Sequence, residues 1–393
     1  MSRLPLLLMT SVLTCIVSTQ APAQNWPRFR GENGSGISDL PGIPSTWTDD
    51  DYAWKIELPY IGHSSPIVWG KTLFVTSATE GGGERFVHCL NADTGKELWQ
   101  KSINLNESRK HQKNSWASST PVTDGDRVCV LFADDAQLLA VAWDFSGQEI
   151  WRRELGAYES EHGLGASPIL YEGLLIIPND QVGPSSLIAL NAATGEIVWQ
   201  SERLPGTTSY STPLIASNGR QGHQIIYLSE SNGITSLDPL TGNLHWKTQK
   251  LPSRTVASPV ESDGLIFATS GGGGTGKYLV ALQSDPAVSD ESRIVFERKT
   301  TLPYVPSMIV FEDMLFLWGD KGILVCLERQ TGRELWSHRI EGGFSGSPIR
   351  IQDRIFCVTE SGEVVVIRAG DQFEELGRTA LHDECHSTPA VAN

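Results

Sequence analysis

Two histidines hold equivalent positions in a motif that recurs along this chain. His63 and His386 each stand three residues before a proline that opens a short aliphatic run. The other copies of the motif carry mixed residues at this position, namely Ser118, Gly165, Tyr210, Val256, Val305 and Ser345. If the copies gather around one axis, these side chains form a ring of polar and aromatic groups that could hold a ligand or a peptide.

Other side chains with useful chemistry lie close to these positions in the sequence. The candidate binding residues at one mouth of the resulting channel are His63, Trp116, His162, Tyr210, Arg254, Tyr304 and His386. The alternative is that they are strand-start residues that bond only to loops and water. A metal on His63, Cys385 and His386 is the weaker interpretation, and we predict no metal site.

Motifs for other chemistries are absent from the sequence. It contains no Gly-x-Ser-x-Gly elbow, no His-Glu-x-x-His and no P-loop. The glycine runs at 81–83 and 271–274 lie between expected strands and are typical of flexible loops. A phosphate cradle would need a following helix, and no sustained helical period is present. We therefore predict no catalytic residue.

The proline motif belongs to a repeat that organises the chain. Eight units begin with a small residue and a proline (a methionine in the sixth), about 40 to 55 residues apart, which is the length of one four-stranded propeller blade. The starts are Ser65-Pro66, Thr120-Pro121, Ser167-Pro168, Thr212-Pro213, Ser258-Pro259, Ser307-Met308, Ser347-Pro348 and Thr388-Pro389. Short apolar runs between turn residues predict strands and hairpins throughout.

Most units close on a tryptophan four residues after a glycine. These tryptophans are Trp99, Trp151, Trp199, Trp246 and Trp336. Glycine suits the tight turn, and an indole offers a large surface to cover the neighbouring blade. The residue ten positions earlier is small in four units (Cys89, Ala189, Ser236 and Cys326), with Val141 the exception. Identical placement in five units favours structural docking over a stack of cofactor-binding tryptophans.

Two departures from the repeat affect the expected fold. The fifth and seventh units lack a closing tryptophan, and Phe296 and Phe373 are expected to substitute. The last unit stops shortly after Thr388-Pro389, while the stretch around Trp54 resembles the outer strand of that same blade. We predict an all-β, eight-bladed β-propeller with four-stranded blades and an incomplete eighth blade, whose open seam could support self-association. The competing prediction is that segment 49–57 folds back and fills the gap.

Composition and charge limit the partners. The formal net charge of −15 and the pI near 5.1 disfavour nucleic acid, because an acidic surface repels phosphates. Residues 1–23 have the charged start, apolar run and Ala-x-Ala ending of a signal peptide, so residues 24–393 are expected to form one exported domain, soluble in the periplasm or cell envelope. No other stretch approaches the length of a membrane span. Five cysteines remain, four in apolar runs and expected to be buried, and Cys385 in a polar stretch.

The spacing Thr-Gly-x-x-x-Trp, preceded by Leu-Asn-Ala or Leu-Asp-Pro, resembles the tryptophan-docking repeat of pyrroloquinoline-quinone (PQQ) propellers. Residues 26–36 are similar to the start of exported bacterial PQQ-binding-like propellers. The same repeat builds BamB-type outer-membrane assembly lipoproteins and PQQ alcohol dehydrogenases. The resemblance implies the eight-bladed fold over nearly all of the chain after residue 23, and leaves the function open.

The resemblance also implies what an enzyme of this family should contain. The dehydrogenases share an adjacent Cys-Cys disulfide, a tryptophan floor, and an aspartate base with acidic calcium ligands. This sequence has no Cys-Cys pair and lacks the long insertions that build their cofactor chamber. We therefore predict a non-catalytic scaffold that binds an envelope protein, a peptide or another envelope component, with no cofactor. The alternatives are a PQQ-dependent dehydrogenase holding PQQ with calcium, and a silent propeller that binds a carbohydrate or other small molecule.

Overall fold

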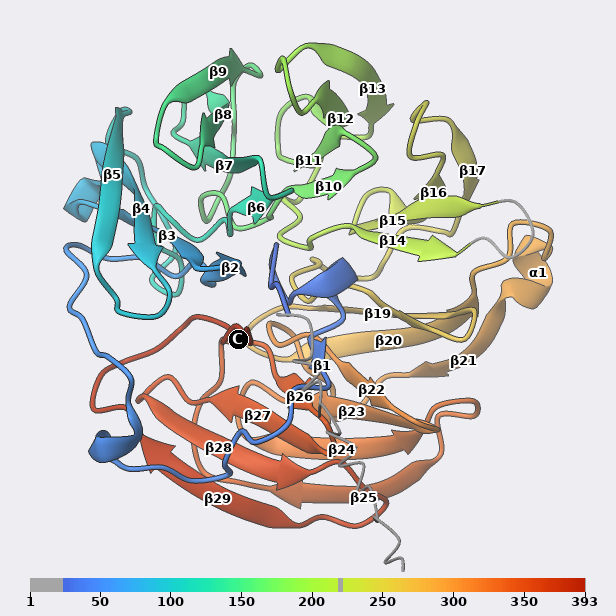
Figure 1. Cartoon of the computed structure of the whole chain (residues 1–393). Coiled ribbons are helices and arrows are strands. Elements are labelled where there is room, and N and C mark those ends of the chain that lie inside the picture. The colour runs from blue at the N-terminus through green and yellow to red at the C-terminus, as the bar shows by residue number, and fades with distance from the viewer. Residues whose placement is uncertain (1–23, 218–221, 393) are drawn as a thin grey trace, which may run out of the picture.

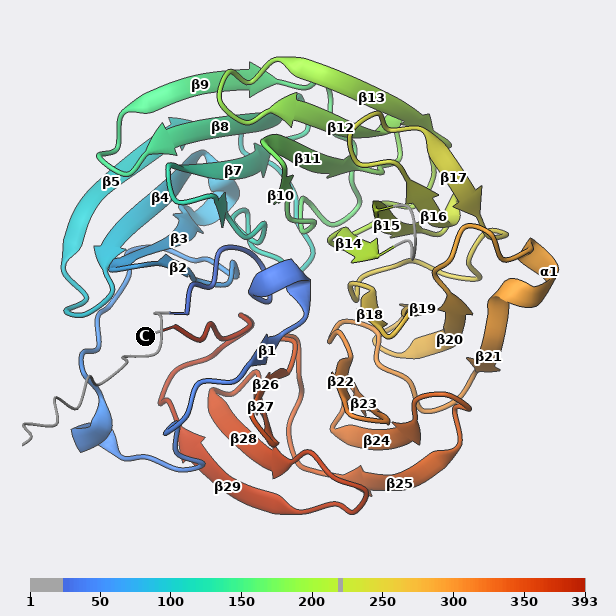
Figure 2. The same ribbon diagram turned by 45° about the vertical axis from the view of Figure 1, so that its right-hand side comes forward.

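Seven β-sheets stand around a common axis in the computed structural model, which describes residues 24–217 and 222–392 (Figure 1). Six sheets have four antiparallel strands, and the first strand of each lies nearest the axis while the last lies at the rim (Figure 2). The seventh sheet gains a fifth strand from the N-terminal part of the chain. We number the sheets 1 to 7 in chain order.

The strands follow one another around the ring. Sheet 1 contains β2 (Ile67–Trp69), β3 (Thr72–Ala78), β4 (Glu84–Asn91) and β5 (Glu97–Asn104). Sheet 2 contains β6 (Val122–Thr123), β7 (Arg127–Ala133), β8 (Leu138–Asp144) and β9 (Glu149–Glu154). Sheet 3 contains β10 (Ile169–Tyr171), β11 (Leu174–Asn179), β12 (Ser185–Asn191) and β13 (Ile197–Arg203). Sheet 4 contains β14 (Leu214–Ser217), β15 (His223–Ser229), β16 (Gly233–Leu237) and β17 (Leu244–Lys247).

The remaining sheets complete the described ring. Sheet 5 contains β18 (Val260–Ser262), β19 (Leu265–Gly271), β20 (Gly276–Gln283) and β21 (Ile294–Arg298). Sheet 6 contains β22 (Ile309–Phe311), β23 (Met314–Trp318), β24 (Ile323–Glu328) and β25 (Glu334–Arg339). Sheet 7 contains β26 (Ile349–Ile351), β27 (Arg354–Val358), β28 (Glu363–Arg368), β29 (Glu375–Ala380) and the added β1 (Ile37–Ser38). The helical pieces are α1 (Asp290–Arg293), η1 (Glu32–Gly34), η2 (Asp49–Asp51) and η3 (Glu80–Gly82).

The turn before each outer strand explains the recurring Asn or Asp of the repeat. The Asn91 side chain accepts hydrogen bonds from the backbone N–H groups of Asp93 and Thr94, and Gly95 follows with a φ of 68°. Asn191 and Asp238 make the same bonds in sheets 3 and 4, and in sheet 2 Asp144 accepts from the N–H groups of Ser146 and Gln148. A short acceptor side chain therefore fixes the turn, and glycine supplies the left-handed residue that it requires.

The closing tryptophans lie between neighbouring sheets, as predicted. Four of them donate their indole N–H to a carbonyl in the next sheet: Trp99 to Phe145, Trp151 to Ala192, Trp199 to Pro239 and Trp336 to Gly370. Trp246 is also buried, but the Arg293 guanidinium lies over its ring at 4.2 Å and its N–H has no hydrogen-bond partner among the described residues. A carbonyl of the next turn thus orients the indole while its rings fill the interface.

The small residue expected beside each indole is its cross-strand partner. Cys89, Ala189, Ser236 and Cys326 pair directly with the tryptophan of the same sheet. In sheet 2 the partner of Trp151 is Ala142, so the apparent exception at Val141 results from a turn, Asp144 to Gly147, that is one residue shorter than Asn91 to Gly95. A small side chain at this position leaves room for the indole.

The prediction for Phe296 fits the structure, but that for Phe373 is wrong. The ring of Phe296 lies against Gly332 of sheet 6, where the other sheets receive an indole. Phe373 instead stacks on His338 of the preceding sheet, with ring centroids 3.7 Å apart. The position of the missing tryptophan is Gly377, which pairs with Val366 and lies against Thr46. The absent indole is therefore replaced by main chain packed on a glycine.

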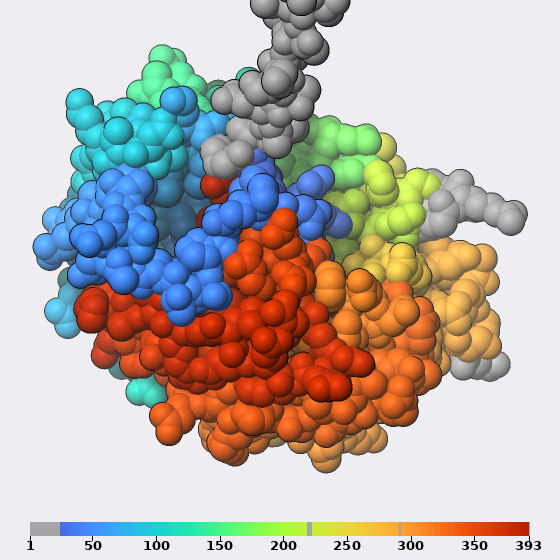
Figure 3. Space-filling view, turned by 60° about the horizontal axis from the view of Figure 1, so that its bottom comes forward, coloured from blue at the N-terminus to red at the C-terminus, as the bar shows by residue number. Residues whose placement is uncertain are grey.

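The eighth blade is not a sheet in the described residues. Between sheets 7 and 1 lie two irregular segments, residues 40–62 and 381–392, which together we call the seam. Figure 3 shows the N-terminal segment on the surface between these two sheets. The expected outer strand around Trp54 is not formed, yet Trp54 donates its indole N–H to the Ala92 carbonyl and packs on Gly95. Trp54 therefore docks on sheet 1 even though no paired strand forms around it.

The five cysteines of residues 24–217 and 222–392 are free thiols. Cys89, Cys129, Cys326 and Cys357 are buried among apolar residues, as expected, whereas Cys385 is half-buried rather than exposed. No helix among residues 24–217 and 222–392 combines the length and apolar character that crossing a membrane requires. The predicted signal peptide at 1–23 lies outside the described residues.

Candidate binding pocket at the ring axis

A belt of hydroxyl groups joins the sheets around the axis. The residue before each repeat proline donates its backbone N–H to the side-chain oxygen of the equivalent residue in the next unit. The bonds run from Ser65 to Thr120, then to Ser167, Thr212, Ser258, Ser307, Ser347 and Thr388, at 2.8–3.3 Å. Only a short side chain with an oxygen can make this contact, which explains why every unit begins with Ser or Thr.

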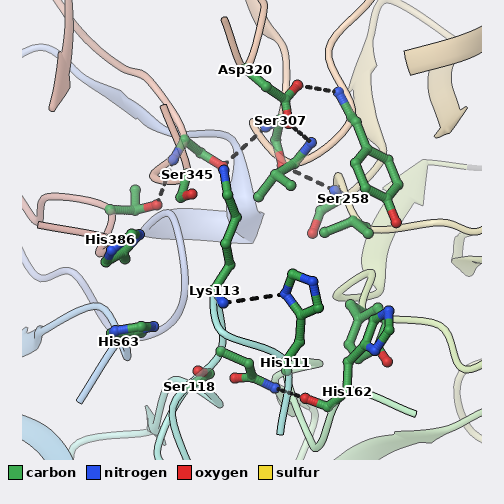
Figure 4. Close-up of a pocket in the computed structure, with 18 of the residues that line it drawn as sticks. His63, His111, Lys113, Ser118, His162, Ser258, Ser307, Asp320, Ser345 and His386 are labelled. Atoms are coloured by element: carbon green, nitrogen blue, oxygen red, sulfur yellow. Dashed lines mark hydrogen bonds between the residues drawn. The ribbon is translucent and has the colours of Figure 1, made fainter. Parts of the chain in front are cut away.

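This belt forms one layer of a cavity of about 530 Å³ on the axis. All eight belt residues line it, and so do all eight residues three positions before the proline: His63, Ser118, Gly165, Tyr210, Val256, Val305, Ser345 and His386. Figure 4 shows several of these side chains converging from different sheets. The volume falls within the range of roughly 300–1,000 Å³ common for small-ligand sites.

The opposite end of the axis is closed by the chain itself. Residues 26–38 cross the ring, and Figure 1 shows this segment over its centre. Arg28 donates to the Pro213 carbonyl at 2.7 Å, and Arg30 to the Met308 carbonyl at 2.6 Å. Both guanidinium groups are buried without a carboxylate partner among the described residues, and this burial lowers their pKa values to about 9. Phe29, between them, lines the floor of the cavity.

Charged groups gather at the open mouth. Arg254 donates to His162 Nε2 at 2.6 Å and to the Glu161 carboxylate. Lys113, in the loop between β5 and β6, reaches the carboxylate of Glu360 at 2.7 Å in the turn between β27 and β28. In Figure 4, Lys113 lies between His111 and the pair formed by His63 and His386. The mouth is therefore bridged by contacts between distant parts of the chain.

The cavity holds two pairs of histidines and one buried carboxyl group. The rings of His63 and His386 lie 4.7 Å apart, as do those of His111 and His162. Burial, and then the nearby His386, lower the pKa of His63 to about 4. Burial raises the pKa of Asp320, although the backbone N–H groups of Tyr304 and Val305 act in the opposite direction. At neutral pH, His63 is uncharged.

Six of the seven candidate residues from the sequence line this cavity: His63, His162, Tyr210, Arg254, Tyr304 and His386. Trp116 does not line it. Its indole packs against the apolar core of sheets 1 and 2 and donates to the Ser108 carbonyl, with Lys110 over its ring. Loop geometry turned this side chain away from the axis. The sequence did not reveal Lys113, Asp320 or the belt, although the invariant Ser or Thr before each proline was a usable signal for the belt.

One constellation outside the cavity resembles a hydrolase triad. His88 Nε2 lies 2.8 Å from Ser77 Oγ, and His88 Nδ1 lies 3.4 Å from Glu97. Ser77 and His88 are almost fully buried, and neither lines the axial cavity. A nucleophile must reach its substrate, so this group is a satisfied polar contact within sheet 1.

A comparison with known families decides what kind of propeller this is. Residues 83–296 and 303–372 match the family described as outer membrane protein assembly factor BamB. The chain belongs to the BamB family. BamB of Yersinia pestis is 22% identical over 306 residues, which cover 71% of this chain and 66% of that protein. The chain thus spans just under two thirds of the length of this relative.

Solved structures support the fold of this BamB-family chain. BamB from Moraxella catarrhalis superposes with a TM-score of 0.59 at 16% identity, over 84% of this chain and 88% of that one. A europium-containing methanol dehydrogenase superposes with a TM-score of 0.57 at 12% identity, over 88% of this chain and 89% of that one. Because one neighbour is an assembly factor and the other an enzyme, these similarities establish a propeller and no activity.

The residues of the cavity do not fit a quinone with calcium. Calcium takes six to eight oxygen ligands, with carboxylates prominent among them. Asp320 is the single carboxylate that lines the cavity, and its two oxygens already accept the N–H groups of Tyr304 and Val305. Within the described part of the chain, no three His, Cys, Asp or Glu side chains are placed to share a metal ion.

Proposed function

We propose that this BamB-family chain is an exported, non-catalytic scaffold that binds a protein, a peptide or another envelope component at the open end of its axis. The observation that carries the proposal is the cavity on the axis, in which the corresponding residues of all eight repeat units converge. It is closed at the far end by residues 26–38 and open where the polar residues gather. A binding surface supplied by every unit around one axis suits recognition, and no group on it is arranged for catalysis.

The proposal includes an eight-position ring. Seven positions carry sheets, and the seam occupies the eighth. Thr388 accepts the belt hydrogen bond from Ser347, and Trp54 docks on sheet 1 as the other tryptophans dock on their neighbours. These two contacts support an eighth position that is held in the ring without a paired sheet.

The location and the absence of a cofactor are parts of the same proposal. A signal peptide at 1–23 and the family's assembly factors favour the bacterial envelope. Both oxygens of Asp320 already accept backbone N–H groups, which disfavours calcium and with it a bound quinone. Incubation with PQQ and calcium should therefore give no dye reduction with alcohols or sugars. Reduction that disappears when calcium is chelated would establish a dehydrogenase instead.

The binding role is tested by affinity capture from envelope extract with pocket variants. Arg254 and Lys321 both line the cavity, so Arg254→Gln and Lys321→Gln alter its mouth, whereas Arg298→Gln changes a residue at the rim of sheet 5. Arg298 and Arg254 have the same side-chain exposure, 17%, and each pairs with a glutamate. Proteins retained by the wild type and Arg298→Gln but lost from both mouth variants would support the proposal. Capture that is identical for all four proteins would overturn it.

A further inference from the structure

The floor of the axial cavity carries hydrogen-bond donors that have no acceptor. A hydroxyl group has one hydrogen to donate and two lone pairs. In seven belt residues the oxygen accepts a backbone N–H, and the hydroxyl hydrogen has no acceptor among the described residues. These residues are Thr120, Ser167, Thr212, Ser258, Ser307, Ser347 and Thr388. Because all seven line the cavity, the floor offers a ring of converging O–H groups.

The mouth adds cationic donors above this floor. Lys321 lines the cavity and has no carboxylate within ion-pair distance in the described part of the chain. Arg254 has a buried Nε with no partner, and its counter-ion Glu161 is more than half exposed. The Nδ1 atoms of His63 and His386 are likewise buried without a partner. These three atoms are not exposed, so Lys321 is the cation that a ligand carboxylate can reach without displacing a carboxylate of the described residues.

Carboxylates in the cavity are scarce by comparison with its cations. Both oxygens of Asp320 are used by backbone N–H groups. Glu161 and Glu360, which pair with Arg254 and Lys113, do not line the cavity. Each belt hydroxyl still has a hydrogen to donate, so a ligand that brings acceptors and negative charge suits the cavity. This excess of cations over carboxylates stands out in a chain whose formal net charge is −15.

The donors lie in two layers, and this arrangement favours an extended ligand over a compact one. Neutral hydroxyl groups form the lower layer, and Lys113, Arg254 and Lys321 stand at the mouth. The C-terminal end of an acidic protein chain can contact both layers at once. Its terminal carboxylate then lies at the hydroxyl layer, and its acidic side chains lie at the mouth. At the closed end, residues 26–38, which include the short helix η1, already show that a segment of chain can occupy the axis of this ring.

We propose that the open end of the axis binds the acidic C-terminal chain end of a partner protein. The terminal carboxylate accepts hydrogen bonds from the hydroxyl belt, and acidic side chains pair with Arg254, Lys321 and Lys113. This inference rests on the proposed function and names the chemistry of its partner. Such charge-assisted hydrogen bonds are the stronger kind, and exclusion of water in the cavity strengthens them further.

The test uses fluorescence anisotropy with an N-terminally labelled hexapeptide of alternating Asp and Glu and a free C-terminal carboxylate. The full-length protein should bind it, and a C-terminal amide of the same sequence should bind about tenfold more weakly because one carboxylate is lost. The corresponding Asn/Gln peptide should not bind. Citrate, a compact polycarboxylate, should displace the peptide only at much higher concentration than the peptide itself requires. Binding should weaken with added salt.

Two variants and a matched control locate the binding. Arg254→Gln and Lys321→Gln should each weaken binding by about tenfold, the usual scale for a charge-assisted contact. Arg298→Gln should bind like the wild type, and thermal unfolding should show that all three variants are folded. Equal binding of the Asn/Gln peptide, an equal loss in Arg298→Gln, or citrate binding as tight as the peptide would each overturn the inference. If envelope proteins still depend on the mouth residues but the acidic peptide does not bind, the scaffold function stands and this inference fails.

Discussion

The contact between sheets 3 and 4 differs from the contact between sheets 7 and 1. Between sheets 3 and 4, a buried indole donates to the facing turn and the belt links Ser167 to Thr212. Between sheets 7 and 1, the seam supplies an indole from Trp54 and a belt acceptor from Thr388, but no sheet stands between them. Tryptophan docking and the belt hydrogen bonds can therefore join a segment to the ring even where its strands do not pair. The seam should then be the weakest part of the ring, and it also forms part of the pocket wall through His386, whose ring lies next to that of His63.

Hydrogen exchange should show the largest difference between these two regions. Few backbone hydrogen bonds tie residues 381–392 to the sheets, among them Leu381 to Gly362 and Cys385 to Glu360. We expect seam amides to exchange about a thousandfold faster than those of β11, β12 and β15, because local opening costs far less than global unfolding. Mass spectrometry of peptic fragments measures this. Equally slow exchange in a monomer would show that the seam is sealed and would also remove the basis for self-association there.

Removing a docked indole should cost more within the sheets than at the seam. Trp199 is 8% exposed, whereas Trp54 is only half-buried. Trp199→Ala should lower the free energy of unfolding by about 3–5 kcal/mol, the usual cost of a large core truncation. Trp54→Ala should cost about 1–2 kcal/mol, mainly its hydrogen bond and partial packing. Urea unfolding measures both values, and equal costs would contradict the idea that the seam is weak.

The same contrast separates what the sequence could predict from what it could not. The strands, the docked tryptophans and the pocket residues His63, Tyr210 and His386 follow from a repeat that sets each side chain in one register. His162, Arg254 and Tyr304 were predicted only from their nearness to the repeat positions in the sequence. Trp116 and Phe373 were misplaced because they lie in loops, where the repeat carries no register. The parallel pairing of β1 with β26 was not foreseen, because Ile37 and Arg350 are far apart in the chain and share no pattern. The repeat thus predicts the features that every unit shares, but not contacts that occur once between distant parts of the chain.

Acid should weaken the seam through His63. Its pKa is about 4 in the folded protein, and an unfolded histidine titrates near 6.5. The folded protein binds a proton at His63 less readily than the unfolded chain does. The contribution of His63 to the free energy of unfolding is therefore fully present above pH 6.5 and is lost as the pH falls towards 4. The loss should reach about 2–3 kcal/mol. In urea unfolding at pH 7 and 4.5, His63→Gln should remove much of this loss, whereas His223→Gln, at an exposed position on sheet 4, should not.

The smallest effect should come from the ion pair that spans the mouth. Lys113 and Glu360 join the loop after sheet 1 to sheet 7 and so bridge the two sides of the seam. Burial acts to raise the pKa of Glu360, but hydrogen bonds from Lys113 and Ser345 lower it overall, so the pair is ionised at neutral pH. Both side chains are partly exposed, and such pairs contribute about 0.2–1 kcal/mol.

A double-mutant cycle with Lys113→Gln and Glu360→Gln measures this contribution directly. We expect a coupling energy below about 1 kcal/mol that falls with salt, because partly exposed charges are screened. The variants should also speed exchange at residues 381–392 and leave β11 and β12 unchanged, since the pair restrains only the seam. A coupling above about 2 kcal/mol would mean that this bridge, rather than docking and the belt, holds sheets 7 and 1 together.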